Sequence, residues 1–145
     1  SVVLVGLFFS VQEAAHVIVK PFGGRIGDRI GHLLNIIIGI VLLALGLFSL
    51  GYVTGIGLFL PALLMGVAQA FVFPSTVALV SEQITETHIG AGMGFIGMWQ
   101  NFGKVAGPVL GGLLISQLGF QPVLLLLAGS LVVSATGLLL VSSSR

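Results

Sequence analysis

Five long apolar runs, separated by short polar segments, constrain this chain more than any other feature. They cover roughly residues 1–22, 33–52, 55–81, 89–116 and 121–142. A helix needs about 20 mostly apolar residues to cross the hydrocarbon core of a bilayer, and each run reaches that length. The runs do not alternate between apolar and polar residues, as the strands of a membrane barrel do. The sequence therefore predicts an all-α integral membrane protein with five transmembrane helices.

Composition excludes most other classes of protein. Charged residues make up 6% of the chain and hydrophobic residues 57%, whereas a soluble domain has about 25% charged residues. There is no cysteine, and no phosphate-binding loop, metal cluster or catalytic triad is recognisable. We therefore expect that the chain is not an enzyme and not a nucleic-acid binder, and that it uses no cofactor and no metal.

The distribution of charge predicts the topology. Glu13 and Lys104 fall inside predicted helices, and the other charged residues lie in the first link, the third link and the tail: Lys20, Arg25, Asp28, Arg29, Glu82, Glu86 and Arg145. Five crossings place these three segments on one side of the membrane. Basic residues favour the cytoplasmic side. We expect a multi-pass protein of the cell (plasma or inner) membrane, with its charged loops and C-terminus in the cytoplasm.

The predicted helices differ in polarity. The second has only Asn35 and the fifth only hydroxyl groups, so these two are expected to be peripheral or to face lipid. The first, third and fourth carry amides and ionisable groups, which are unfavourable in hydrocarbon. These three helices should therefore face a protein interior or a water-filled cavity.

The most unusual side chain in the first helix is Glu13. It lies eight residues before Pro21, which corresponds to roughly 12 Å along a helix and places it near the bilayer midplane. His16 follows on the same face. One interpretation is that Glu13 binds a proton or the substrate and that His16 tunes it. The alternative is a neutral or ion-paired contact between helices.

A second group of polar residues marks the fourth helix. Gln100, Asn101 and Lys104 share one face by their spacing, and Gln69 is the amide of the third helix. Lys104 either binds an anionic group or pairs with Glu13 in a central cavity, or it extends to the membrane interface and anchors the helix.

The segment from Lys20 to His32 reads as a glycine-rich link between two spans. It resembles the signature loop of the major facilitator superfamily (MFS), in which Gly is followed by Asp-Arg and then by Gly with basic residues. Gly24, Asp28, Arg29 and Gly31 match this pattern, and His32 stands where a second basic residue is usual. The resemblance implies a conformational-switch loop.

The fourth helix carries a second resemblance to the same superfamily. Its Gly-x-x-x-Gly-Pro-x-x-Gly-Gly run resembles a pattern best known from MFS antiporters, and it comprises Gly103, Gly107, Pro108, Gly111 and Gly112. Small residues at this spacing form a ridge for close helix packing. Together the two motifs extend the resemblance over nearly the whole chain.

The resemblance implies a half-transporter. MFS proteins have two six-helix halves, and residues 1–145 would be a single membrane domain with helices 8–12, or less favourably helices 2–6. Ala62 stands where the N-terminal half usually has Arg, and the chain opens inside an apolar run without Met, as a fragment would. Its expected partners are the missing half, the lipid bilayer, protons and a small-molecule substrate.

The function implied is secondary active transport of a small organic solute by alternating access. Proton-coupled efflux is favoured by the antiporter-like motif. Lys104 keeps open the alternative of proton-coupled uptake of an anionic metabolite. A membrane sensor or assembly partner that kept the fold without transport is the third alternative.

Overall fold

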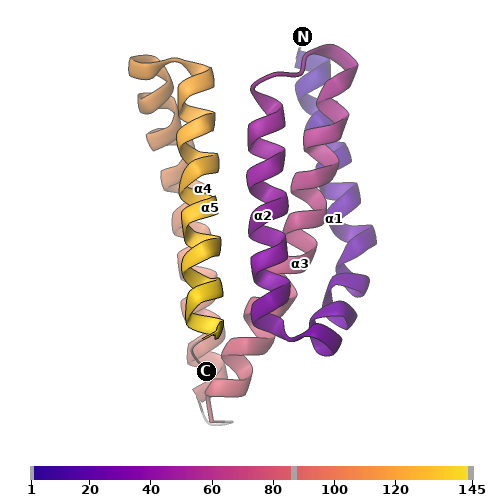
Figure 1. The fold of residues 1–145 in the computed structure, drawn as a ribbon, viewed down its shortest axis with the longest axis vertical. Coiled ribbons are helices and arrows are strands. Elements are labelled where there is room, and N and C mark those ends of the chain that lie inside the picture. Colours follow the sequence, from indigo (N-terminus) through magenta and orange to yellow (C-terminus); the bar gives the residue numbers. More distant parts are fainter. Residues whose placement is uncertain (1, 86–87, 144–145) are drawn as a thin grey trace.

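The computed structural model describes residues 2–85 and 88–143 of the chain. Five long helices run alternately up and down the bundle (Figure 1), and one short 3-10 turn precedes the third of them. The elements are α1 (Val2–Ile30), α2 (His32–Leu50), η1 (Gly55–Leu58), α3 (Phe59–Gln83), α4 (Ile89–Leu118) and α5 (Phe120–Ser143). The predicted all-α fold is confirmed.

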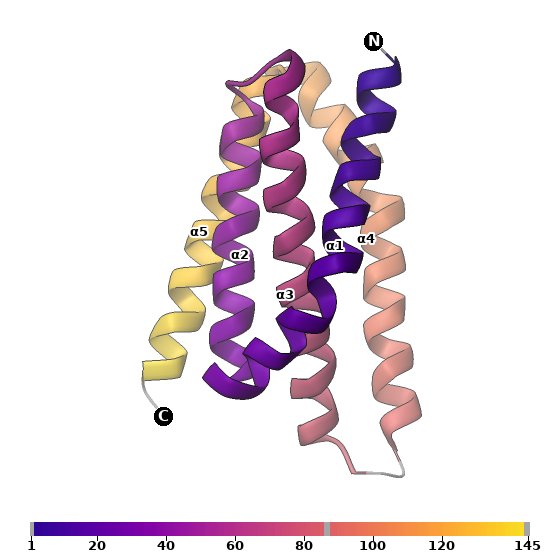
Figure 2. The ribbon, with the colours of Figure 1, turned by 90° about the vertical axis from the view of Figure 1, so that its right-hand side faces the viewer.

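Four segments are long and apolar enough to cross a membrane: α1, α2, η1 with α3, and α5. The fifth helix, α4, is 30 residues long. Its hydropathy is lowered by Gln100, Asn101 and Lys104 near its middle. It nevertheless runs the length of the bundle, and Figure 2 shows that it diverges from α5 away from the link that joins the two helices. The polar middle of α4 therefore makes it the helix that is least suited to lipid.

The charged segments gather at one end of the bundle. Figures 1 and 2 show the α1–α2 link, the end of α3, the start of α4 and the end of α5 at one end, opposite the start of α1. This arrangement agrees with the five-crossing topology. Glu86 and Arg145, which were part of that prediction, lie outside the described residues.

The prediction of a link from Lys20 to His32 is wrong. The helix α1 continues through Pro21 to Ile30, and the chain breaks only at Gly31, whose φ of 97° ends the helix. Figure 2 shows the last part of α1 bending away from the axis of its first part. A proline removes one backbone hydrogen bond and kinks a helix. Here Gly23 and Gly27 are buried, and their packing keeps the chain helical after Pro21.

The centre of the bundle is α3. Both α1 and α2 pack along it, whereas α1 and α2 contact each other only sparsely. Glycines make these approaches possible: a Cβ at Gly66 would overlap the Gln12 carbonyl oxygen of α1, and a Cβ at Gly39 would lie 3.0 Å from the Ala68 carbonyl oxygen of α3. Small residues are the usual means of close helix packing in membranes.

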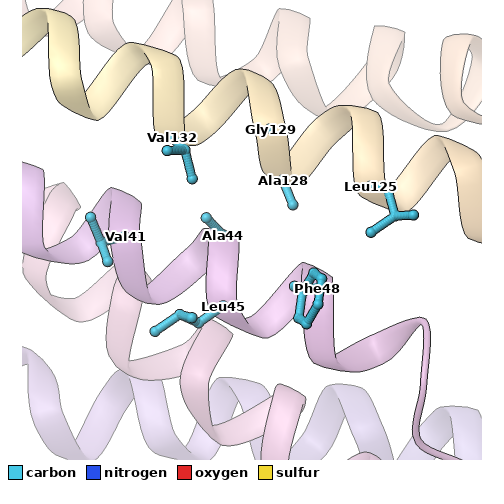
Figure 3. A pocket seen from close by; sticks show the side chains of 8 residues that line it. All are labelled: Val41, Ala44, Leu45, Phe48, Leu125, Ala128, Gly129 and Val132. Atoms are coloured by element: carbon cyan, nitrogen blue, oxygen red, sulfur yellow. The ribbon is translucent and has the colours of Figure 1, made fainter.

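The remaining two helices pack differently. The helix α5 lies against α2, and the two line an apolar groove of about 460 Å³ (Figure 3), made of Val41, Ala44, Leu45, Phe48, Leu125, Ala128, Gly129 and Val132. The expectation that both helices are peripheral stays a prediction for α2, because α2 packs along α3 as well as against α5. The helix α4 contacts its neighbours sparsely and has no buried residue within the described part of the chain.

The glycine ridge of α4 does not pack against another helix here. A Cβ added at Gly103, Gly107, Gly111 or Gly112 would meet nothing within 4 Å in the described residues. The close packing predicted for this motif is therefore not made by this chain alone.

Candidate functional site

A cavity of about 800 Å³ lies among α1, α3 and α4. Five of the six residues predicted to bind substrate or protons line it: Glu13, His16, Gln69, Gln100 and Lys104. Asn101 is exposed and does not belong to the lining. The rest of the lining consists of Lys20, Leu43, Val72, Phe73 and Gly103.

Helical spacing explains how the three helices present these side chains. Glu13, His16 and Lys20 follow one another at intervals of three and four residues on α1. Gln69 stands in the same relation to its cavity-lining neighbours on α3, and Gln100 to Lys104 on α4. Residues three and four apart lie on one helix face. Each helix therefore presents one face to the cavity, and on α3 this face carries Gln69 beside the apolar Val72 and Phe73.

The cavity contains one carboxylate, that of Glu13, and two ammonium groups, those of Lys20 and Lys104. Glu13 and Lys104 line the same space, but no ion pair joins them in the described part of the chain. The predicted pairing of these two charges is thus not observed.

Lys20 occupies a different place from the one predicted. The sequence put it in a link, but it lies in α1 beside the cavity. Its Nζ lies 5.1 Å from the centroid of the Phe73 ring on α3. A cation over an aromatic face at this distance is attracted to the ring. Lys20 thus adds a second positive charge to the site.

Two buried atoms on α1 lack hydrogen-bond partners within the described residues: Gln12 Oε1 and His16 Nδ1. They lie one turn apart on the helix. A buried polar atom without a partner costs about 1–3 kcal/mol. The Nδ1 atom of His16 therefore retains unused hydrogen-bonding capacity within the described residues.

Sequence reasoning missed a buried polar node at the charged end. Asn35 is fully buried (0% exposed), and its Nδ2 donates to Gly23 O at 2.9 Å, Phe71 O at 3.3 Å and Ser75 Oγ at 2.7 Å. The node joins α1, α2 and α3. The signal was an amide in an otherwise apolar helix, because such a group needs partners.

The switch-motif residues lie at the same end of the bundle. Gly24, Asp28 and Arg29 lie in α1, and Gly31 separates α1 from α2. Arg29 lies in the last turn of α1, where a positive charge interacts favourably with the helix dipole. Asp28 Oδ1 lies 3.7 Å from His32 Nε2. Their role as a conformational switch remains a prediction.

Comparison with known proteins gives matches over the whole chain. The profile of the Major Facilitator Superfamily matches residues 1–145. An uncharacterized MFS-type transporter of Bacillus subtilis, YuxJ, is 33% identical over 116 residues, which are 79% of this chain and 29% of that protein. The multidrug resistance protein MdtG of Serratia proteamaculans is 30% identical over 127 residues, 87% of this chain and 31% of the relative.

A more distant match is a probable vesicular acetylcholine transporter of Danio rerio, 27% identical over 86% of this chain and 26% of its own length. The chain thus spans about a third of the length of the relatives it matches. The five-helix fold, the whole-chain profile match and these relatives show that the chain belongs to the Major Facilitator Superfamily.

Proposed function

We propose that this chain is part of a secondary active transporter that moves a small organic solute by alternating access, coupled to protons. Family membership and the named relatives support membrane transport. The observation that carries the finer proposal is the cavity shared by Glu13, His16, Gln69, Gln100 and Lys104. Polar and ionisable groups inside a membrane bundle mark solute and proton pathways.

In this proposal Glu13 is the residue that couples solute movement to protons. When it is ionised, its carboxylate offsets one of the two ammonium groups of the cavity, Lys20 and Lys104. When it is protonated, both positive charges remain. A proton on Glu13 therefore disfavours a cationic solute and favours its release, which is the charge relation that antiport requires.

We favour proton-coupled efflux as the direction. The antiporter-like glycine run of α4 supports it, as does the relative named as a multidrug resistance protein. One observation supports a second candidate, the proton-coupled uptake of an anionic metabolite: two ammonium groups face one carboxylate. With Glu13 protonated, the same cavity attracts an anion, and proton and solute then move together.

The rest of the transporter would complete the site. We propose that the five helices are helices 8–12 of a twelve-helix protein, in accord with a chain that spans about a third of its relatives. The open glycine ridge of α4 would then face the missing half. The charged end would face the cytoplasm of the cell.

The test is a coupling assay on the full-length transporter in proteoliposomes, with fluorescent organic cations and organic acids as solutes. Glu13→Gln should reduce proton-driven transport more than tenfold, an effect of at least about 1.4 kcal/mol. It should leave solute exchange within about twofold, because exchange needs no net proton transfer. Glu13→Asp, the matched control, keeps a titratable carboxyl group and should retain coupling.

Lys104→Gln distinguishes the two candidate functions, proton-coupled efflux and proton-coupled uptake of an anionic metabolite. It should weaken transport of the organic acid more than that of the organic cation if uptake of an anion is the function. An unchanged proton-driven rate in Glu13→Gln at every pH would refute the role of the cavity in coupling.

A further inference from the structure

A histidine at the charged end of the bundle contacts acidic groups on two other helices. His32 begins α2, and its side chain is 14% exposed. Its Nε2 lies 3.4 Å from Glu82 Oε1 on α3 and 3.7 Å from Asp28 Oδ1 on α1. One imidazole ring thus stands between carboxylates of the two helices that flank its own.

The other nitrogen of this ring faces the interior. His32 Nδ1 is buried and makes no hydrogen bond within the described residues, and the same is true of Asn35 Oδ1 one turn further along α2. Both side chains border Gly27: a Cβ there would lie 3.0 Å from His32 Nδ1 and 3.1 Å from Asn35 Nδ2. His32 and Asn35 therefore both lie against the same glycine of α1.

Protonation changes what this ring can bind. A neutral imidazole has one donor and one acceptor, whereas an imidazolium has two donors. When the neutral ring carries its hydrogen on Nε2, it can donate to only one of the two carboxylates. Its Nδ1 is then an acceptor, and it faces an interior that offers it no donor among the described residues. The imidazolium carries its charge beside both Asp28 and Glu82, and both of its ring nitrogens are donors.

We propose that His32 is a proton-binding site that fastens the charged ends of α1 and α3 to the start of α2. With the proton bound, the three helix ends are held together, and on its loss Asp28 and Glu82 are released. The facing charged groups among the described residues are Asp28 from α1 and Glu82 from α3. From α5, Val141 lines the cavity of about 530 Å³ beside the ring.

This site is separate from the solute cavity, since the two share no lining residue. A test of His32 therefore does not depend on the identity of the solute or on the role of Glu13. Histidine is the side chain that ordinarily changes charge between pH 5 and 8. The site would make the packing of the helix ends depend on the pH of the solution that bathes them.

The first test is thermal unfolding of the purified full-length transporter in detergent between pH 5.5 and 8.0. The wild-type Tm should fall as the pH rises, because only the imidazolium joins both carboxylates. His32→Arg should keep the low-pH Tm throughout this range, and His32→Gln the high-pH Tm. His88→Gln, which removes another histidine, is the matched control and should keep the wild-type pH dependence.

A second readout follows the helix ends directly. Spin labels on Arg25→Cys of α1 and Gln83→Cys of α3 should show a larger short-distance population at pH 5.5 than at pH 8.0. His32→Gln should remove this difference. Glu82→Gln should reduce it and serves as the test if His32→Gln does not fold. A full pH dependence of Tm and distance in both variants would overturn the proposal.

Discussion

At the scale of single residues, Asn35 shows how one amide can organise three helices. Its NH₂ group has two hydrogens but three acceptors within 3.3 Å, so one hydrogen is shared. Gly23 O and Phe71 O are carbonyl oxygens that can only accept, which fixes the orientation of the amide. Inside a membrane there is no water that could replace these hydrogen bonds.

Asn35→Leu tests the node. Leucine keeps a similar size but removes every donor, so we expect the free energy of unfolding to fall by about 1–3 kcal/mol. The measurement is the unfolding midpoint of the full-length transporter in an SDS titration. Ser75→Ala removes one acceptor only and should shift the midpoint less. A midpoint for Asn35→Leu equal to that of the wild type would refute the structural role of the node.

The cavity residues could be predicted because each is a polar group in an apolar run. Such groups avoid lipid, so Glu13, Gln69 and Lys104 had to face a common interior. The environment of Asn35 could not be predicted in this way. Its partners are two backbone carbonyls and a serine up to 40 positions away, and no pattern in the sequence indicates those contacts.

At the scale of elements, the prolines inside helices do not end them. Pro21 lies in α1, Pro74 in α3 and Pro108 in α4. Pro74 has no N–H, so the Ala70 carbonyl loses its usual helical donor, and Gly23 of α1 packs against this carbonyl. The sequence Pro-Phe-Gly-Gly is typical of a turn. Its helical conformation depends on packing against α3, which the local sequence does not contain.

Gly66→Ala tests this mode of packing. The new methyl group would overlap the Gln12 carbonyl and lie 2.8 Å from Ala15 Cβ, so α1 and α3 must separate. Overpacking of this kind costs about 1–3 kcal/mol, measurable as a lower Tm of the full-length transporter. Gly137→Ala, whose added methyl meets nothing within 4 Å, should be neutral or stabilise by up to about 1 kcal/mol. Equal Tm values for the two variants would contradict the close contact.

At the scale of the whole molecule, the bundle is packed unevenly. The helices α1, α2 and α3 form a tight group, whereas α4 has no buried residue within the described chain. Charge distribution along the sequence predicted which ends lie together, and the fold agrees (Figure 1). It could not predict the loose placement of α4, because a pattern of charges does not specify how closely a helix packs against its neighbours.

The central claim is that the cavity among α1, α3 and α4 is the solute pathway, open to one side of the membrane at a time. The direct measurement is the rate at which a water-soluble thiol reagent labels Gln69→Cys in the full-length transporter made otherwise free of cysteine. This chain has no cysteine of its own. Leu126→Cys, on the exposed apolar surface of α5, is the control and should remain unlabelled.

The account predicts that Gln69→Cys reacts from either side, that a pH gradient shifts the rate from one side to the other, and that a transported organic compound slows it. A Gln69→Cys that is unreactive from both sides, or whose rate neither the gradient nor the compound changes, would contradict the claim that solute passes through this cavity.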